Sequence, residues 1–314
     1  MCTRIGIVTE DHYHILGRTM DWDTLRVSPL FLPRNFEWQT LYDHRTYRNQ
    51  YALVGGGFTN LKRTDVSDGV NEKGLMVQKL TFDHGGQLTK ERHADKFQFA
   101  AFELALYFLG HFASIADIEN HLDEIELMTD TYSDVKFDHA EQHFAVMDAT
   151  GRMVVIEPSQ SPLKLRENPL GVLTNHPSFD SQLRKMEDYV TFTPEFEAGK
   201  VPLDTFHVTT GRLSGKKTPP GAYSPSARFV RAAYMKEFAD QPTNLAAGVA
   251  TTSHLLDTVT VPKSQGHRPT FSVYRSIAVA ETKTYYFQAY SQLSMTALRL
   301  TPELAVKTTA QVYQ

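Results

Sequence analysis

Alternating apolar and polar positions mark the start of the chain as a β-hairpin. The segments 3–9 and 13–20 are rich in β-branched residues, and the turn residues Asp11 and His12 separate them. Further strand-like runs follow at 30–33, 51–55 and 75–82. The pattern predicts that the N-terminal residues pair within a sheet and do not form a free tail.

Helical periodicity of the apolar residues appears next along the chain. Apolar side chains recur on one face of 96–109, which predicts a helix there. A second helix is expected at 114–125, where Ser114 can cap the N-terminus and acidic residues occupy the first turns. Ser226 is expected to cap the helix that follows Pro225. The remaining expected helices span 180–190, 226–239 and 244–256.

Two more groups of strands are predicted around the later helices. Residues 143–158 read as two strands around an Ala-Thr-Gly turn, and 170–175 as another strand. The segment 270–291 alternates like a hairpin with its turn at Thr282 and Lys283. Strands and helices therefore occur in blocks. This order argues against a parallel βαβ sheet and favours an α+β fold of mostly antiparallel sheets with helices packed outside.

The composition is globular, and a chain of this length could form one large domain or two. Because no repeat and no low-complexity linker appears, we expect one domain spanning 1–314. Hydrophobic residues make up 41% of the chain and charged residues 22%, and the net charge of −4 gives no general attraction to nucleic acid or anionic membrane. No basic-then-apolar leader is visible, and no apolar run reaches the length of a membrane span. We therefore expect a cytoplasmic protein that does not bind nucleic acid or insert into a membrane.

Sequence signatures of several common chemistries are missing. No HExxH, cysteine pair or carboxylate–histidine cluster accompanies the 13 histidines, so we expect no metal and no other cofactor. The glycine-rich stretch 54–58 lacks the Lys-Ser/Thr of a phosphate loop and is expected to form a turn. The GxSxG signature of serine hydrolases is also absent.

Cys2, which directly follows the initiator methionine, is the only cysteine of the chain. Removal of Met1 would leave it with a free α-amine, and an unperturbed α-amine (pKa about 8) matches a thiol (about 8.5) for proton transfer without a histidine. Arg18 and Asp21 lie on the strand expected to pair with Cys2, where they could position an N-terminal nucleophile. The alternative is a structural cysteine beside an ordinary ion pair.

Five separated motifs resemble those of the choloylglycine hydrolase family in order and spacing. They are MCT…GRTMDW (1–22), DGVNEKGLM (68–76), VIEP (155–158), GVLTNHPSFD (171–180) and SPSARFVRAAYMK (224–236). The family contains conjugated bile salt hydrolases and penicillin V acylases, which are N-terminal nucleophile hydrolases. The resemblance covers nearly the whole chain and implies a four-layer αββα sandwich, hydrolysis of a small-molecule amide without a cofactor, and a homotetramer.

The resemblance also implies roles for particular residues. Cys2 matches the nucleophile and amine base, and Arg18 and Asp21 match the pair that positions it. Asn175 matches the side-chain donor of the oxyanion hole, and Arg228 matches the arginine that supports the site. From the hydrophobic pattern alone, Asn175 would be a turn residue at a strand end and Arg228 a surface charge on a helix.

Two departures from the family pattern concern the substrate. Thr81 stands in LTF where bile salt hydrolases have asparagine in LNF and penicillin V acylases have tyrosine, although its backbone N–H can still stabilise an oxyanion. The loop 209–223 replaces a longer glycine-rich stretch of the family. The absence of LNF and the forms of DGVNEKGLM and SPSARF favour a penicillin V acylase-like enzyme, with conjugated bile salt hydrolase as the alternative.

Aromatic side chains near the site are candidates for the wall of an acyl pocket. These candidates are Trp22, Phe58, Tyr132 and Phe137. Core packing would explain Phe58, Tyr132 and Phe137 equally well. A function of another class, a thiol sensor or small-molecule binder, predicts that Cys2 reacts with oxidants but that no amide is cleaved.

Overall fold

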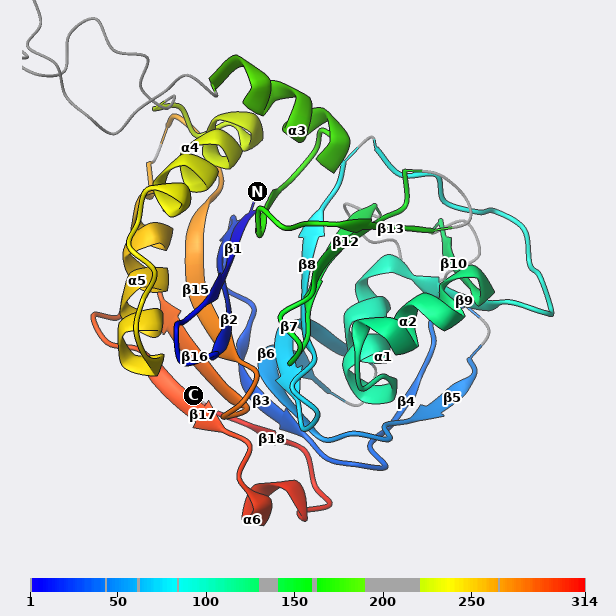
Figure 1. Cartoon of the computed structure of the whole chain (residues 1–314). Helices are drawn as coiled ribbons and strands as arrows, with labels where there is room; N and C mark the ends of the chain where they lie inside the picture. The colour runs from blue at the N-terminus through cyan, green and yellow to red at the C-terminus, as the bar shows by residue number, and fades with distance from the viewer. Residues whose placement is uncertain are drawn as a thin grey trace, which may run out of the picture.

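Two antiparallel sheets pack face to face at the centre of the molecule, and helices cover the outer face of each sheet (Figure 1). The computed structural model describes residues 2–42, 44–60, 63–83, 85–129, 141–159, 163–189, 221–264 and 266–313. Each sheet packs one face against the other sheet and its opposite face against helices, so the arrangement has four layers. The predicted αββα fold class is confirmed.

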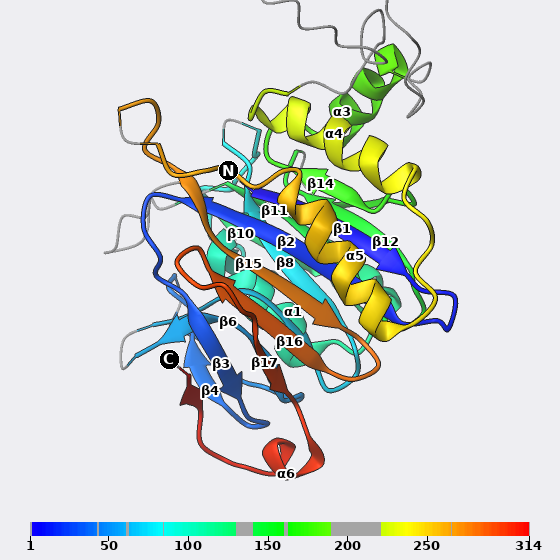
Figure 2. The ribbon, with the colours of Figure 1, turned by 90° about the vertical axis from the view of Figure 1, so that its left-hand side faces the viewer.

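The first sheet has six strands in the order β14-β1-β2-β15-β16-β17. Their bounds are Val172–Thr174 (β14), Cys2–Val8 (β1), His14–Trp22 (β2), Phe271–Val279 (β15), Thr284–Ala289 (β16) and Thr296–Arg299 (β17). Strands β1 and β2 form the predicted N-terminal hairpin, which β15 extends on one side and β14 on the other. Figure 2 looks onto this sheet. The N-terminal strand is therefore an inner strand of the sheet.

The second sheet has eight strands in the order β13-β12-β11-β8-β7-β6-β3-β18. Their bounds are Lys164–Glu167 (β13), Met153–Glu157 (β12), Gln142–Met147 (β11), Met76–Thr81 (β8), Thr64–Asn71 (β7), Leu53–Thr59 (β6), Ser28–Leu32 (β3) and Gln311–Val312 (β18). Two small sheets pair Glu37–Gln39 (β4) with Thr46–Arg48 (β5), and Phe97–Ala100 (β9) with Ile125–Met128 (β10).

Strand β7 and the glycines of β6 differ from the sequence prediction. The stretch 54–58 was expected to form a turn, but it lies inside β6. A Cβ atom on Gly56 would lie 2.3 Å from the hydroxyl of Tyr285 and 2.9 Å from a carboxylate oxygen of Asp68. Glycine is therefore required there by close packing, and not by a turn. Strand β7 was not predicted, because several of its buried positions are polar.

The helices cover the two outer faces. Helices α4 (Pro225–Glu237) and α5 (Leu245–Asp257) pack on the six-stranded sheet, and α1 (Leu104–His111) packs on β7 and β8 of the other sheet (Figures 1 and 2). The shorter helices are α2 (Ile115–His121), α3 (Phe179–Met186) and α6 (Pro302–Ala305). The 3₁₀ turns are η1 (Ala101–Glu103), η2 (Leu122–Glu124) and η4 (Glu187–Tyr189).

Several predicted helix boundaries were wrong. The segment 96–109 begins as strand β9, because it pairs in parallel with β10, and becomes an α-helix only in α1. The N-cap of α4 is Ser224, whose side chain accepts from the backbone N–H of Ala227, so Ser226 is not the cap. Pro225 lies in the first turn, where its missing N–H costs no hydrogen bond. The predicted cap Ser114 is confirmed.

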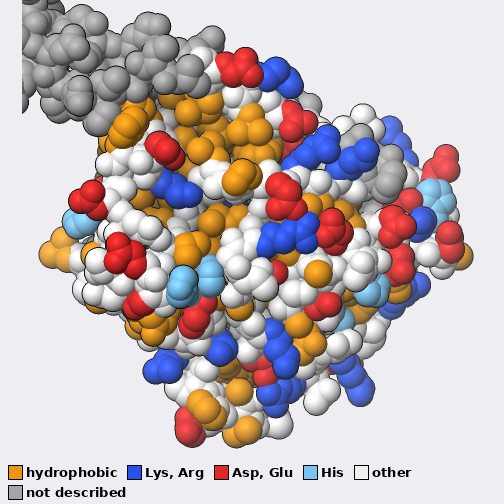
Figure 3. Space-filling model, in the orientation of Figure 1, with side chains coloured by type: hydrophobic (Ala, Val, Ile, Leu, Met, Phe, Trp, Pro, Cys, Tyr) orange, Lys and Arg blue, Asp and Glu red, His pale blue; other side chains and the backbone are white. Residues whose placement is uncertain are grey.

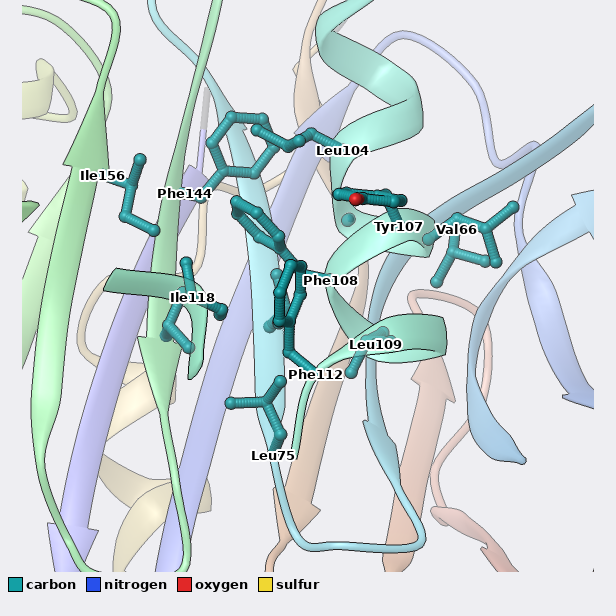
Figure 4. Close-up of a cluster of buried hydrophobic side chains, with 14 of the residues drawn as sticks. Val66, Leu75, Leu104, Tyr107, Phe108, Leu109, Phe112, Ile118, Phe144 and Ile156 are labelled. Atoms are coloured by element: carbon teal, nitrogen blue, oxygen red, sulfur yellow. The ribbon is translucent and has the colours of Figure 1, made fainter. Parts of the chain in front are cut away.

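The core between α1 and the eight-stranded sheet is built largely from aromatic and aliphatic side chains (Figure 4). Phe108 of α1 and Phe112 just after it are buried, and Phe108 meets Phe144 of β11 edge-on with the ring centroids 6.0 Å apart. A second cluster lies around β1, and it includes Cys2 and Leu80. The cysteine is thus held in a packed environment.

On the face shown in Figure 3, acidic and basic side chains are interspersed, and apolar side chains gather near α3 and α4. Among the described residues, no helix is both long enough and apolar enough to cross a membrane. The predicted pocket residues Tyr132 and Phe137 and most of the loop 209–223 lie outside the described residues.

Candidate active site

The register of the N-terminal hairpin places the thiol of Cys2 beside two side chains of β2. Cys2 lies opposite Met20, and Arg18 lies two residues earlier on the same face of the strand. Nη2 of Arg18 donates a hydrogen bond to Sγ of Cys2 at 3.1 Å, and Sδ of Met20 lies 3.5 Å from that sulfur. Cys2 is buried. The predicted neighbourhood of Cys2 and Arg18 is therefore present in the structure.

Arg18 is held by groups of the opposite sheet. Its Nη1 donates to the backbone carbonyls of Ser67 at 3.2 Å and Lys79 at 2.9 Å, and lies 3.2 Å from Oδ2 of Asp68. Burial alone would lower the pKa of Arg18, but the surrounding groups, with Tyr274 the strongest and Asp68 among them, outweigh burial and raise that pKa. Arg18 is thus a permanent cation next to the thiol.

Asp68 of β7 is the centre of a buried polar cluster that the sequence analysis missed. The carboxylate accepts hydrogen bonds from the hydroxyls of Tyr274 at 2.8 Å, Tyr285 at 2.5 Å and Ser276 at 3.3 Å, and it pairs with Arg18. Four buried groups therefore fix this carboxylate. The only available signal in the sequence was the position of Asp68 in the DGVNEKGLM motif, because β7 shows no clear alternation of apolar residues.

The main chain of Cys2 is held by Asn175 and Arg228. The backbone nitrogen of Cys2 donates to Oδ1 of Asn175, and Nη1 of Arg228 donates to the carbonyl of Cys2 at 2.6 Å. Arg228 also donates to Oδ1 of Asn175 at 3.1 Å and to the hydroxyl of Thr3. Asn175 directly follows β14, which pairs with β1, and Arg228 lies on α4. The sheet order therefore brings these distant residues to the N-terminus.

Arg228 is fully buried, which corrects the pattern-based view of it as a surface charge. Burial lowers the pKa of Arg228, while the charges of Asp21 and Cys2 act in the opposite direction. Oδ2 of Asp21 lies 3.8 Å from Nη1 of Arg228, and Oδ1 accepts from the hydroxyl of Ser272 at 2.5 Å. Asp21 therefore lies on the Arg228 side of the hairpin, whereas Arg18 lies on the other.

The backbone of Thr81 faces Asn175. Nδ2 of Asn175 donates to the carbonyl of Thr81 at 2.9 Å. The N–H of Phe82 donates to the backbone carbonyl of Glu141, the residue just before β11, so the N–H and C=O of Thr81 point away from β11. The last residue of β8 that pairs with β7 is Gln78, so β7 does not pair with Thr81. The Thr81 N–H therefore lies on the same edge of the strand as the carbonyl that Asn175 contacts.

A cavity of about 310 Å³ opens beside the thiol. Its lining residues include Cys2, Met20, Trp22, Phe58, Arg63, Asp65, Lys79, Thr81, Phe102 and Tyr274. Trp22 and Phe58 thus lie where the sequence analysis expected them. The cavity has aromatic walls and one buried charged region, which is typical of a small-molecule site. Within the described part of the chain, no group of three or more His, Cys, Asp or Glu side chains could hold a metal ion.

The chain matches the model of the linear amide C–N hydrolases, choloylglycine hydrolase family, over residues 2–308. It is 26% identical over 312 residues to a bile salt hydrolase/transferase from Clostridium perfringens, covering 96% of this chain and 93% of the relative. It is also 26% identical over 268 residues to a penicillin V acylase from Pectobacterium atrosepticum, covering 79% of this chain and 63% of that protein.

A solved structure shares the whole fold. The crystal structure of the C2A mutant of conjugated bile acid hydrolase from Clostridium perfringens superposes with a TM-score of 0.84 at 25% identity, covering 100% of this chain and 97% of that one. The fold is therefore that of the N-terminal nucleophile hydrolases, and the family match spans nearly the whole sequence. The chain belongs to the choloylglycine hydrolase family of linear amide C–N hydrolases.

Proposed function

We propose that the protein cleaves a linear amide through an acyl-thioester on Cys2 after removal of Met1. One observation carries this proposal: three buried groups hold the nitrogen, the carbonyl and the sulfur of Cys2 separately. Asn175 accepts from the nitrogen, Arg228 donates to the carbonyl, and Arg18 donates to the sulfur. A structural cysteine needs only apolar neighbours, so this arrangement supports catalysis.

The first step forms the thioester. The α-amine of Cys2 takes the thiol proton, and the sulfur, stabilised as an anion by Arg18, attacks the amide carbon. The C–N bond then breaks, and the α-ammonium returns the proton to the leaving amine nitrogen. Asn175 and Arg228 hold the N-terminus so that one residue supplies both nucleophile and base.

The tetrahedral oxyanion would be held by two donors, the backbone N–H of Thr81 and Nδ2 of Asn175. Loss of one such donor typically costs about 3 kcal/mol of transition-state stabilisation. In the second step, the α-amine takes a proton from water, the hydroxide attacks the thioester, and the C–S bond breaks. The acid leaves and the thiol regains its proton, so no cofactor takes part.

The substitution Cys2→Ala tests the proposal. We expect the release of amine from any linear amide substrate to fall below detection, because both acylation and deacylation need the sulfur. Circular dichroism should show an unchanged fold, since alanine fits the same packed position. Turnover by Cys2→Ala equal to that of the wild type would remove Cys2 from the mechanism.

The size of the cavity supports a compact acyl group. A volume of about 310 Å³ lies at the lower end of the range for ligand sites, which favours a phenoxyacetyl group over a steroid. We therefore propose a penicillin V acylase-like specificity. The bile salt hydrolase relatives, which match over more of their length, support conjugated bile salts as the second candidate.

Parallel assays of amine release from penicillin V and from glycine- and taurine-conjugated cholate separate the two candidates. A higher kcat/KM for penicillin V supports the first, and a higher value for either bile salt supports the second. On the family resemblance we also propose a homotetramer, which light scattering coupled to size-exclusion chromatography would test. On the sequence pattern we propose a cytoplasmic location.

A further inference from the structure

Besides the exposed Arg26, three charged side chains that the hydrolysis does not use line the cavity beside Cys2. Arg63, Asp65 and Lys79, here named the cationic cluster, line the cavity together with the rings of Phe58 and Phe102. Side chains of this type cost free energy to bury unless their charges are paired. The pairing in this cluster is therefore informative about what the cavity binds.

Lys79 is the buried member of the cluster, with only 8% of its side chain exposed. Its ammonium group donates to a carboxylate oxygen of Asp65 and to the backbone carbonyl of Phe102 at 3.3 Å. An ammonium group has three N–H donors. Within the described ranges, the third donor has no acceptor, although Lys79 lines the cavity.

Arg63 lies above the same carboxylate. Its Nη2 is 3.4 Å from Oδ2 of Asp65, which is its only hydrogen-bond acceptor among the residues that the structure describes. The guanidinium group lies 4.9 Å from the ring centroid of Phe58 and 4.6 Å from that of Phe102. These rings hold the guanidinium in place, so its remaining N–H donors are preorganised for a ligand.

The charges of the cluster do not cancel. Two cations share the one carboxylate of Asp65, which leaves one positive charge in excess. Burial lowers the pKa of Lys79, and although Asp65 opposes this effect, the positive charges of Arg63 and Arg18 add to it. A bound anion would compensate the excess charge. Such an anion would also occupy the spare donors of both cations.

The order of product release indicates which half of the substrate, the acyl group or the amine, lies beside the cationic cluster. Among the residues that line the cavity, Thr24 and Arg26 are exposed, whereas Lys79 and Phe102 are buried. In the proposed mechanism the amine leaves first, while the acyl group is still bonded to Cys2. An amine beside the buried Lys79 and Phe102 would have to leave past the acyl group, so we place the acyl group toward the cationic cluster.

We propose that, among the compact acyl groups that fit the cavity, those with a carboxylate or a similar anionic group are cleaved faster than a neutral group such as phenoxyacetyl, because the anion binds to Arg63 and Lys79. This inference rests on the proposed thioester mechanism and specifies its substrate class. Neutral acyl groups of the same size would still react, because the groups around Cys2 contact the backbone of Lys79 but none of the side chains of the cluster. They would do so with lower kcat/KM.

Matched coumarin amides provide the test. Glutaryl, adipoyl and suberoyl amides of 7-amino-4-methylcoumarin would be compared with their neutral methyl esters, which have nearly the same shape. A third set would carry a neutral acyl group and place the carboxylate on the coumarin. For at least one chain length we expect a kcat/KM about tenfold or more above that of the methyl ester, as for a hydrogen bond to a charged group.

Arg63→Gln tests the cluster directly, because Arg63 is one-third exposed and its removal leaves the Lys79–Asp65 pair intact. We expect the ratio of kcat/KM for the carboxylated acyl group to kcat/KM for its methyl ester to fall by about tenfold. Arg48→Gln is the charge-matched control, because Arg48 pairs with Glu37 on an exposed hairpin away from the cavity lining. It should keep the preference.

Three results would overturn the inference. In the first, the wild type has a higher kcat/KM for the methyl ester than for the acid at every chain length. In the second, Arg63→Gln lowers kcat/KM for the acid and for the ester equally. In the third, a carboxylate raises kcat/KM only when it is on the coumarin. In each case hydrolysis that is lost in Cys2→Ala would leave the proposed mechanism standing. Absence of Cys2-dependent hydrolysis of every amide in the set would contradict the mechanism and the inference together.

Discussion

Nη2 of Arg18 donates to the thiol of Cys2, while Nη1 donates to a backbone carbonyl of the opposite sheet. The orientation of the guanidinium group therefore depends on residues that do not contact the sulfur. Asp68 is the only carboxylate paired with Arg18 in the described structure, and it is itself fixed by Tyr274 and Tyr285. A fixed carboxylate keeps the guanidinium from rotating away. We therefore regard Asp68 as a positioning residue for the cation beside Cys2.

Asp68→Asn should lower kcat/KM by at least about tenfold, equivalent to about 1.4 kcal/mol. The amide keeps the shape of the carboxylate but removes the charge that orients Arg18. The rate of alkylation of Cys2 by iodoacetamide at pH 7 should also fall, which a purely structural role of Asp68 would not cause. Tyr285→Phe, which removes one hydroxyl and keeps the charge, should have a smaller effect. Unchanged alkylation in Asp68→Asn would contradict this role.

At the scale of the strand, Gly56 of β6 makes room for this cluster. A Cβ at this position would overlap the Tyr285 hydroxyl and approach the Asp68 carboxylate. Gly56→Ala should therefore lower the free energy of unfolding by about 1–3 kcal/mol, the usual cost of overpacking. Urea denaturation would measure it.

Gly221→Ala is the matched control for this substitution, because a Cβ there meets no atom within 4 Å. It should leave the free energy of unfolding nearly unchanged. If Gly56→Ala were as stable and as active as Gly221→Ala, the close packing around Asp68 would be unimportant.

At the scale of the helix, Lys236 of α4 donates to the carbonyl of Leu170 at 2.6 Å, next to the start of β14. Burial lowers the pKa of Lys236 to about 8 from its ordinary value of 10.5. The unfolded chain therefore binds more protons than the folded protein between these pH values, so this residue makes stability rise with pH from about 8 to 10.5.

Urea denaturation of the wild type and Lys236→Met at pH 7.5, 8.5 and 9.5 would measure this contribution. The difference between their free energies of unfolding should change in favour of the wild type as the pH rises. A difference that is constant across the three pH values would show that the ammonium group is not destabilised by the fold.

At the scale of the whole molecule, the N-terminal hairpin was predictable because its signals are local. Alternation and the turn at Asp11 and His12 define β1 and β2, and their pairing brings Arg18 to Cys2. The block order of strands and helices likewise indicated the layered fold. Local patterns could not indicate that Asn175 and Arg228 meet at the N-terminus, because this depends on β14 pairing with β1 and on α4 packing over them.

The family motifs supplied that long-range information, whereas the cluster around Asp68 and the cationic cluster were not predicted. Both clusters include residues of β7, and this strand cannot be recognised from alternating hydrophobicity because several of its residues are polar. In the same way, the glycines of β6 resemble a turn until the packing of Tyr285 is known. Polar side chains buried between layers carry little local signal, although they determine the chemistry.

The most direct test of the central claim is peptide mass spectrometry of the wild-type enzyme quenched in acid during turnover of an amide substrate. We predict an N-terminal peptide that begins at Cys2, without Met1, and that carries the mass of the acyl group on residue 2. Full activity in a chain that retains Met1, or an acyl group found on another residue, would contradict the mechanism. A Cys2 that is oxidised but never acylated would instead identify a thiol sensor.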